Sequence, residues 1–221
     1  SGVSPEGQFG LNAQTEKIGV LNAGTASADV TFAFLFENGS AYRYLLTVPA
    51  GQHGFVAVQD LLNFPTGTPY GVTYSSTQPV TVGTFSDAFN DGVASTFADT
   101  AYTVWGFGEG FRPGDSDNHP GVVENLRIYN PDTALTTVEI TITYDGVPGG
   151  ETFRRSIDAK RVAEFNIDQF ITGSRRASSA WYSITVKAPT PVVAYMSHYD
   201  RVFPGGFGTL DTPLGISAAV S

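Results

Sequence analysis

The feature that most constrains the fold is a strand–turn–strand unit that occurs twice in the chain. The later copy, residues 126–144, reads LRIYNPDTALTTVEITITY and turns at Asn130-Pro131-Asp132. After this turn, apolar residues occupy positions 138, 140, 142 and 144, with polar residues between them. Such alternation predicts a half-buried β-strand, because successive side chains leave opposite faces of the pleat. The earlier copy, residues 18–36, turns at Asn22-Ala23-Gly24, 108 positions before, and has apolar residues at 30, 32, 34 and 36.

The repeat continues beyond this unit. Hairpin signals follow at 37–40 and 145–150, and strands led by Pro79 and Pro191 come near the end of each copy. Each copy offers about six or seven short strands, a number typical of a β-sandwich, and helix is limited to single turns near residues 60–62 and 168–171. We therefore expect an all-β protein with two tandem jelly-roll-like antiparallel β-sandwich domains, residues 1–104 and 105–221, related by internal duplication. No flexible linker separates them, so they should pack closely.

Composition excludes several classes of function. The chain of 221 residues carries a net charge of −9, which argues against nucleic-acid binding and against anionic membrane surfaces. No cysteine is present, so disulfides and thiolate sites are excluded. No apolar run approaches the ~20 residues that span a bilayer, and we expect no membrane insertion. The Thr, Ser, Gly and aromatic richness favours an extracellular or cell-surface location, with a cytoplasmic one as the alternative.

Several short motifs point to a known family. Residues 105–113 read WGFGEGFRP, and a strand at Pro191-Val192-Val193 leads into SHYDR at 197–201. In the first copy, VLNAG at 20–24 is followed by LTVPA at 46–50. In this order the chain resembles the soluble sensory-rhodopsin transducer family and related β-sandwich domains of unknown function. The resemblance implies a jelly-roll-like sandwich that tends to associate, acts through protein contacts and has no enzyme activity, in a fold similar to carbohydrate-binding modules. The chain departs from the family in being a fused pair and in lacking a Trp before residues 5–9.

Aromatic residues are the first candidate site. Trp181 and Tyr182 begin a strand, and Phe111 lies among glycines. Flat rings with polar neighbours can stack on sugar faces, whereas the alternative is packing in a core or between the copies. We name Trp181, Tyr182, Phe111 and His198 as candidate ligand-binding residues. For Trp105 and Phe107 we favour packing in a core or between the copies.

The polar loop at 112–121 is a candidate metal site. Asp115, Asp117 and Asn118 could offer the oxygen ligands that calcium takes, and the alternative is a solvated turn. No other cofactor is indicated. Ser197 and His198 are neighbours on a strand and face opposite ways, so we expect no catalytic site there, and His198 should instead bond across the sheet.

These observations favour a non-catalytic structural or interaction protein that associates with itself or with another surface protein. The alternative is a carbohydrate-binding module that uses its loop aromatics, with calcium assisting. An enzyme is a distant third.

Overall fold

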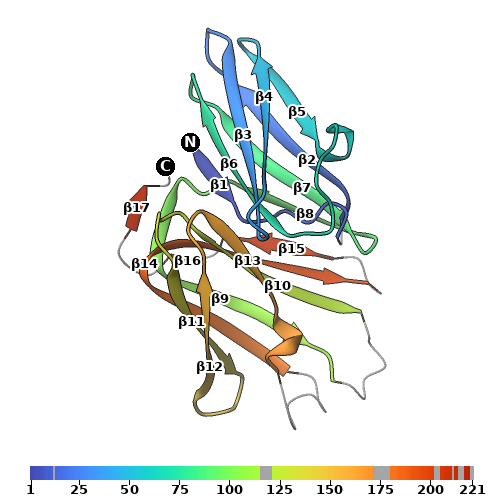
Figure 1. Ribbon diagram of the computed structural model, residues 1–221. Helices are drawn as coiled ribbons and strands as arrows, with labels where there is room; N and C mark the ends of the chain where they lie inside the picture. Colours follow the sequence, from blue (N-terminus) through green and yellow to red (C-terminus); the bar gives the residue numbers. More distant parts are fainter. Residues whose placement is uncertain are drawn as a thin grey trace.

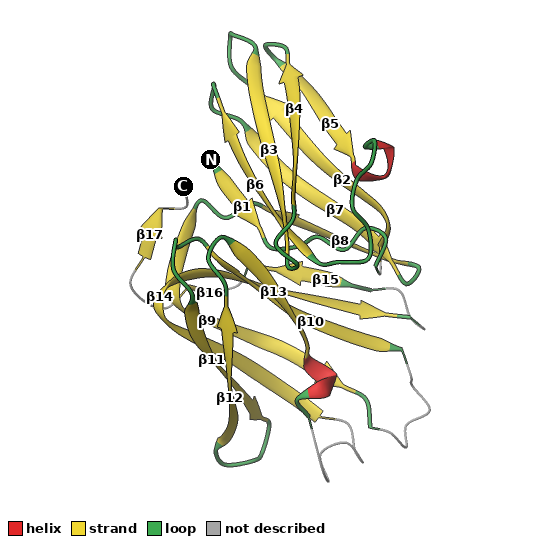
Figure 2. Cartoon of the chain, viewed as in Figure 1, coloured by secondary structure: helices red, strands yellow, loops and turns green. Residues whose placement is uncertain are grey.

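The computed structural model describes residues 1–11, 13–114, 121–171, 180–201, 205–210, 212–213 and 217–219. The described residues form β-strands and two single-turn 3-10 helices, one in each half of the molecule (Figure 2). In chain order the elements are β1 (Gly2–Ser4), β2 (Ala13–Asn22), β3 (Ala28–Phe36), β4 (Ala41–Val48), β5 (Gln52–Ala57), η1 (Val58–Asp60), β6 (Tyr70–Ser76), β7 (Thr81–Ala88), β8 (Asp91–Thr96), β9 (Thr100–Arg112), β10 (Val122–Asn130), β11 (Thr136–Tyr144), β12 (Gly150–Ile157), β13 (Arg161–Asn166), η2 (Ile167–Gln169), β14 (Ala180–Asp200), β15 (Phe207–Thr209), β16 (Thr212–Pro213) and β17 (Ser217–Ala219).

Strands β1 to β8 form the first half, a sandwich of two antiparallel sheets (Figure 1). One sheet has the order β1-β6-β3-β4 and the other the order β5-β2-β7-β8. The core between them is rich in aromatic rings, and the four alternating apolar residues of β3 are fully buried in it, as the sequence predicts. These residues are Val30, Phe32, Phe34 and Phe36.

Strands β9 to β17 form the second half, in which the 21-residue strand β14 belongs to both layers. Its first part pairs with β9 and β11, and its last part pairs with β10 and β15. The layers are therefore β9-β14-β11-β12 and β13-β10-β14-β15. Trp105 and Phe107 of β9 are buried in the core between them, which confirms the prediction for these two residues.

The two halves have the same strand order. The layer β9-β14-β11-β12 corresponds to β1-β6-β3-β4, and β13-β10-β14-β15 corresponds to β5-β2-β7-β8. Asn22 and Asn130 also make matching bonds, because each side-chain amide donates to three backbone carbonyls across its turn. The all-β sandwich architecture is confirmed. The internal duplication and the boundary at residues 104 and 105, which falls within β9, remain predictions that this correspondence supports.

The first half packs directly against one sheet of the second half (Figure 1). The layer β13-β10-β14-β15 thus lies between its own core and the first half. For this reason β10 does not alternate: residues 124–130 are all buried, since each face of the strand meets protein. Close packing of the halves is confirmed.

Candidate functional site

A buried ion pair network joins the two halves. The guanidinium of Arg127 on β10 is fully buried and lies 2.5 Å from Glu164 of β13. On its other side it lies 3.1 Å from Glu6, which belongs to the first half. Burial disfavours the charged form of Arg127, but the carboxylates of Glu164 and Glu6 outweigh it and raise the pKa above its ordinary value. The charge is therefore retained, and it ties the first half to the second.

Uncharged polar groups complete this network. Arg127 donates to the Gln8 side-chain oxygen at 3.1 Å and to the Ser197 hydroxyl at 3.3 Å. The Tyr199 hydroxyl donates to Glu6 at 2.9 Å and also contacts the Gln8 amide nitrogen. All of these side chains are buried, so the network binds the halves together and offers no opening to a ligand.

Glu16 lies behind the network, within the first half. Its carboxylate accepts the backbone N–H of Gln8 at 2.7 Å, the Ser86 hydroxyl at 3.1 Å and the Tyr70 hydroxyl. Burial raises the pKa of Glu16 to about 7, although the bonds from Tyr70 and Gln8 act in the opposite direction. The carboxyl therefore titrates near neutral pH in the folded protein.

An apolar cluster and the carboxylate of Asp91 make further contacts between the halves. Side chains from β2, β7 and β8 pack on the rings of Tyr195 and Tyr199. Asp91 of β8 accepts backbone N–H groups of Asp200 and Gly205 at 3.2 Å each. Burial opposes ionisation of Asp91, but these backbone bonds lower its pKa overall. In the sequence, the one indication of the contact between the halves is Arg127, a charged residue within the otherwise apolar run at 126–129.

The predicted aromatic site is partly assembled. Trp181 is 60% exposed, and its ring centroid lies 4.5 Å from that of the half-buried Phe111. Tyr182, the next residue along β14, points to the other face and is buried against the core, where its ring lies directly over Gly110. Tyr182 is thus a core residue, whereas Trp181 and Phe111 form an exposed aromatic pair.

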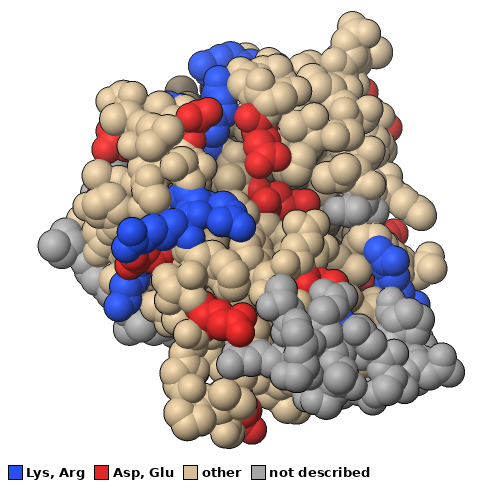
Figure 3. Space-filling model, turned by 60° about the horizontal axis from the view of Figure 1, so that its bottom comes forward, with Lys and Arg blue, Asp and Glu red and all other residues tan. Residues whose placement is uncertain are grey.

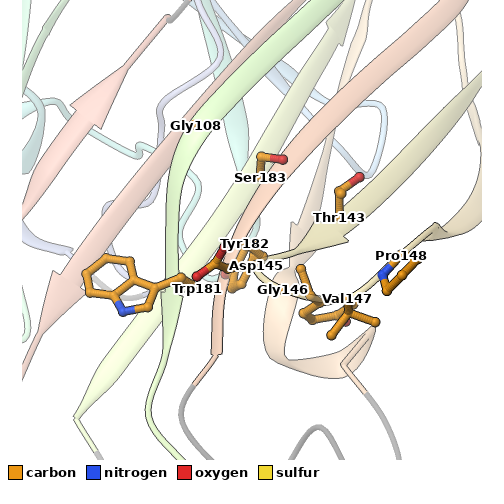
Figure 4. Close-up of a pocket in the computed structure, with 10 residues that line it drawn as sticks. Gly108, Thr143, Asp145, Gly146, Val147, Pro148, Trp181, Tyr182 and Ser183 are labelled. Carbon is orange, nitrogen blue, oxygen red and sulfur yellow. The ribbon is translucent and has the colours of Figure 1, made fainter.

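A shallow hollow of about 630 Å³ lies beside Trp181. Figure 4 shows the indole on one side and the tip of the β11–β12 hairpin, with Val147 and Pro148, on the other. The backbone N–H of Asp145 donates to the carbonyl of Trp181 at 2.9 Å, which fixes this hairpin against the start of β14. Thr143, Asp145 and Ser183 contribute polar groups to the lining.

His198 is held by a cross-strand partner, as predicted. Its Nδ1 lies 2.8 Å from the Glu124 carboxylate, directly opposite on β10. The same carboxylate oxygen accepts the backbone N–H of Phe111 at 3.0 Å. Burial raises the pKa of Glu124, although His198 and the Phe111 N–H act against it. Glu124 therefore links two of the predicted residues, and sequence reasoning did not single it out.

The predicted calcium ligands Asp115, Asp117 and Asn118 lie outside the described residues, so this site stays a prediction. Among the residues that the structure does describe, no group of three or more His, Asp or Glu side chains could hold a metal ion. Within the same residues, no helix is long and apolar enough to cross a membrane.

Charged side chains do not gather into a single basic surface on the face shown in Figure 3, where short groups of Lys and Arg have acidic residues beside them. One exposed pair is Arg154 with Glu139, at 2.6 Å.

The first half presents an apolar sheet surface to solvent. On the outer face of β5-β2-β7, Phe55 is 60% exposed, Leu21 48% and Phe85 43%. Gly19 of β2 lies between β5 and β7, directly opposite Phe55 on one side and Gly83 on the other, so the middle of this surface has no side chains. We call this surface the open face, and it consists of Lys17, Gly19, Leu21, Phe55, Gly83 and Phe85, with the exposed polar residues His53 and Thr81 on either side of Leu21.

Comparison with known proteins gives one family. Residues 100–204 match the family described as Anabaena sensory rhodopsin transducer. This match confirms the resemblance expected from the sequence, and it covers the second half of the chain. None of the curated proteins compared with the chain matches it.

Three solved structures are similar to the chain over part of its length. The crystal structure of Thermotoga maritima 1070 is 19% identical with a TM-score of 0.43, over 52% of this chain and 96% of that one. The Anabaena sensory rhodopsin transducer is 20% identical with a TM-score of 0.34, over 42% and 92%. A tandem CBM22 domain of Paenibacillus barcinonensis Xyn10C is 10% identical with a TM-score of 0.22, over 83% and 77%.

Proposed function

We propose that this protein is a non-catalytic interaction module that associates with copies of itself through the open face. The observation that carries the proposal is the exposure of Phe55, Leu21 and Phe85 together around two glycines. Large apolar side chains that are exposed together on one sheet face favour a contact with another molecule, here with Lys17, His53 and Thr81 among them. The transducer family matched by the second half is a non-enzymatic kind, which supports the same reading. We further propose a location at the cell surface or outside the cell.

Sedimentation velocity over a range of protein concentrations tests this function. We expect the wild-type chain to form larger species as concentration rises. Phe55→Asp should weaken association at least about tenfold, because it places a charge in the centre of the contact. Leu45→Asp is the matched control, since Leu45 is 58% exposed on the outer side of β4, away from the open face. A wild-type chain that stays monomeric, or a Phe55→Asp variant that associates as the wild type does, contradicts the proposal.

Glycan binding is the second candidate function, and it is favoured by the hollow beside Trp181. An exposed indole paired with Phe111, next to Thr143, Asp145 and Ser183, combines an apolar platform with polar groups that could bond sugar hydroxyls. Retention on insoluble polysaccharides such as cellulose, xylan and chitin tests it. If it is correct, Trp181→Ala abolishes retention and Leu135→Ala, at another exposed apolar residue, preserves it. Absence of retention on every polysaccharide removes this candidate.

A further inference from the structure

We infer that the open face of one chain binds the end of the second half of another copy. The chains then assemble head to tail. The contact between molecules repeats the contact that joins the two halves within one molecule. This inference rests on the proposed self-association and adds to it the surface on the partner.

The open face corresponds, position by position, to the surface of the second half that the first half covers. Gly19 is paired with Phe55 and Gly83, and at the corresponding register Arg127 is paired with Glu164 and Tyr195. Lys17 and Leu21 likewise correspond to Asn125 and Tyr129, which lie two residues either side of Arg127, and Phe85 corresponds to Ser197.

We call the surface of the second half that the first half covers the covered face, and it consists of Asn125, Arg127, Tyr129, Glu164, Tyr195 and Ser197. Five of these six residues are buried and the side chain of Glu164 is 16% exposed, whereas their counterparts are exposed apart from the half-buried Gly83.

The part of the first half that rests on the covered face is one end of its sandwich. Glu6 and Gln8 bond Arg127 there. The β3–β4 hairpin contributes Glu37, which approaches Glu164, and the carbonyl of Gly39, which accepts from Arg161 at 2.7 Å. The start of β6 contributes Gly71, beside Val162 and Tyr129. We call this set the docked end, and it consists of Glu6, Gln8, Glu37, Gly39 and Gly71.

The second half carries the same end, in which Asp145, Val147 and Trp181 are exposed and Phe111 and Ser183 are half-buried. The N–H of Glu37 bonds the carbonyl of Pro69 at 2.9 Å, and the N–H of Asp145 bonds the carbonyl of Trp181 at the same distance. Gly7 lies under the ring of Tyr70 as Gly110 lies under the ring of Tyr182. These matches place Phe111 at the position of Gln8, Asp145 at that of Glu37 and Ser183 at that of Gly71. We call this set the free end, and it consists of Phe111, Asp145, Val147, Trp181 and Ser183.

Residue types differ between the covered face and the open face, and they also differ between the docked end and the free end. Inside the chain, the covered face presents Arg127 and Glu164, and the docked end meets them with Glu6 and Gln8. On the exposed surfaces, the arginine position is Gly19 and the glutamate position is Phe55. The glutamine position is Phe111 with Trp181 beside it, and the position of Glu6 is the exposed Glu109. The Arg127–Glu164 pair is thus replaced by apolar residues on the open face, and Gln8 is replaced by an aromatic ring on the free end, where the acid of the Glu6 position is kept. Nothing lies within 4 Å of a Cβ placed at Gly19, so the space that Arg127 fills in the second half is open here, and we place an aromatic ring of the free end in it.

The charges at the margins agree with this pairing. Lys17 lies at one end of the open face, with its ammonium 6.0 Å from the centre of the Phe55 ring, and Asp145 is exposed on the free end. Opposite charges at the rim of an apolar contact favour association and set its orientation. Because the open face and the free end are different surfaces, the contact is heterologous, and such contacts close into rings or extend into chains.

Two variants mixed together test the arrangement. Phe55→Asp removes the open face and Trp181→Ser removes the free end, so each variant alone should be monomeric by sedimentation velocity. Their equimolar mixture should form a two-chain complex, because each supplies the surface that the other lacks. A Trp181→Ser variant that associates like the wild type overturns the inference, and if Phe55→Asp still abolishes association the contact is face to face and the proposed function stands. If Trp181→Ser loses only polysaccharide retention, the free end is a glycan site and the inference also fails.

Site-directed cross-linking is a second test of the head-to-tail contact. The chain has no cysteine, so each introduced thiol is unique. By the correspondence with Glu164 and Glu37, residues 55 and 145 should lie together between molecules. A mixture of Phe55→Cys and Asp145→Cys chains should give cross-linked dimers with a short thiol-reactive linker at least tenfold faster than a mixture of Leu45→Cys and Asp145→Cys chains. Equal rates overturn the head-to-tail arrangement.

Discussion

Replacing Arg127 by alanine is expected to lower the free energy of unfolding by about 3–5 kcal/mol. The guanidinium is fully buried between Glu6 and Glu164, so its removal leaves the buried carboxylate of Glu6 and the largely buried carboxylate of Glu164 without their counter-charge. Urea unfolding followed by tryptophan fluorescence measures the loss, since Trp105 is buried in the core of the second half.

The matched control is Arg154→Ala. Arg154 also pairs with a glutamate at 2.6 Å, but its side chain is 74% exposed, and a solvated pair of this kind contributes at most about 1 kcal/mol. A triple variant that combines Arg127→Met with Glu6→Gln and Glu164→Gln should recover much of the stability, because no isolated charge remains. If Arg127→Ala costs no more than Arg154→Ala, the two halves do not meet at a buried charge network.

The local pattern was sufficient to predict the strands, their inward faces and the asparagine turns. Val138, Ile140 and Ile142 are buried because alternation along one strand depends only on that strand. The contact between the halves could not be predicted in the same way. Glu6 and Arg127 are 121 positions apart, and residues 5–9 form no periodic pattern that would place them against β10.

In the candidate site, too, the features of single strands could be predicted and the pairing between strands could not. Trp181 and Tyr182 look alike in sequence, but strand parity sends one to solvent and the other into the core, and the register of β14 could not be fixed without its partners. The open face was missed because Leu21, Phe55 and Phe85 occupy the outward positions of three separate strands. Only the pairing of β5, β2 and β7 brings them together.

Wild-type stability should fall as pH rises through the range from 4.5 to about 7 because of Glu16. The ordinary pKa of the carboxyl is 4.5 and burial raises it to about 7 in the folded protein. Below 4.5 the group is protonated in both states. Between the two values only the unfolded chain releases the proton, so unfolding becomes easier, and above about 7 both states are ionised and the loss is complete. A difference of this size corresponds to roughly 3 kcal/mol.

Glu16→Gln isolates this effect from the other carboxylates. The amide keeps an acceptor for the N–H of Gln8 and for Ser86, and it cannot ionise beside Tyr70 and Glu6. The difference in free energy of unfolding between variant and wild type should therefore grow by about 3 kcal/mol from pH 4.5 to pH 8, with the variant gaining. Glu139→Gln, at an exposed glutamate, should show no such trend. A difference that stays constant across this range would mean that Glu16 is already ionised in the folded state at pH 5 and that hydrogen bonds from Tyr70, Gln8 and Ser86 outweigh its burial.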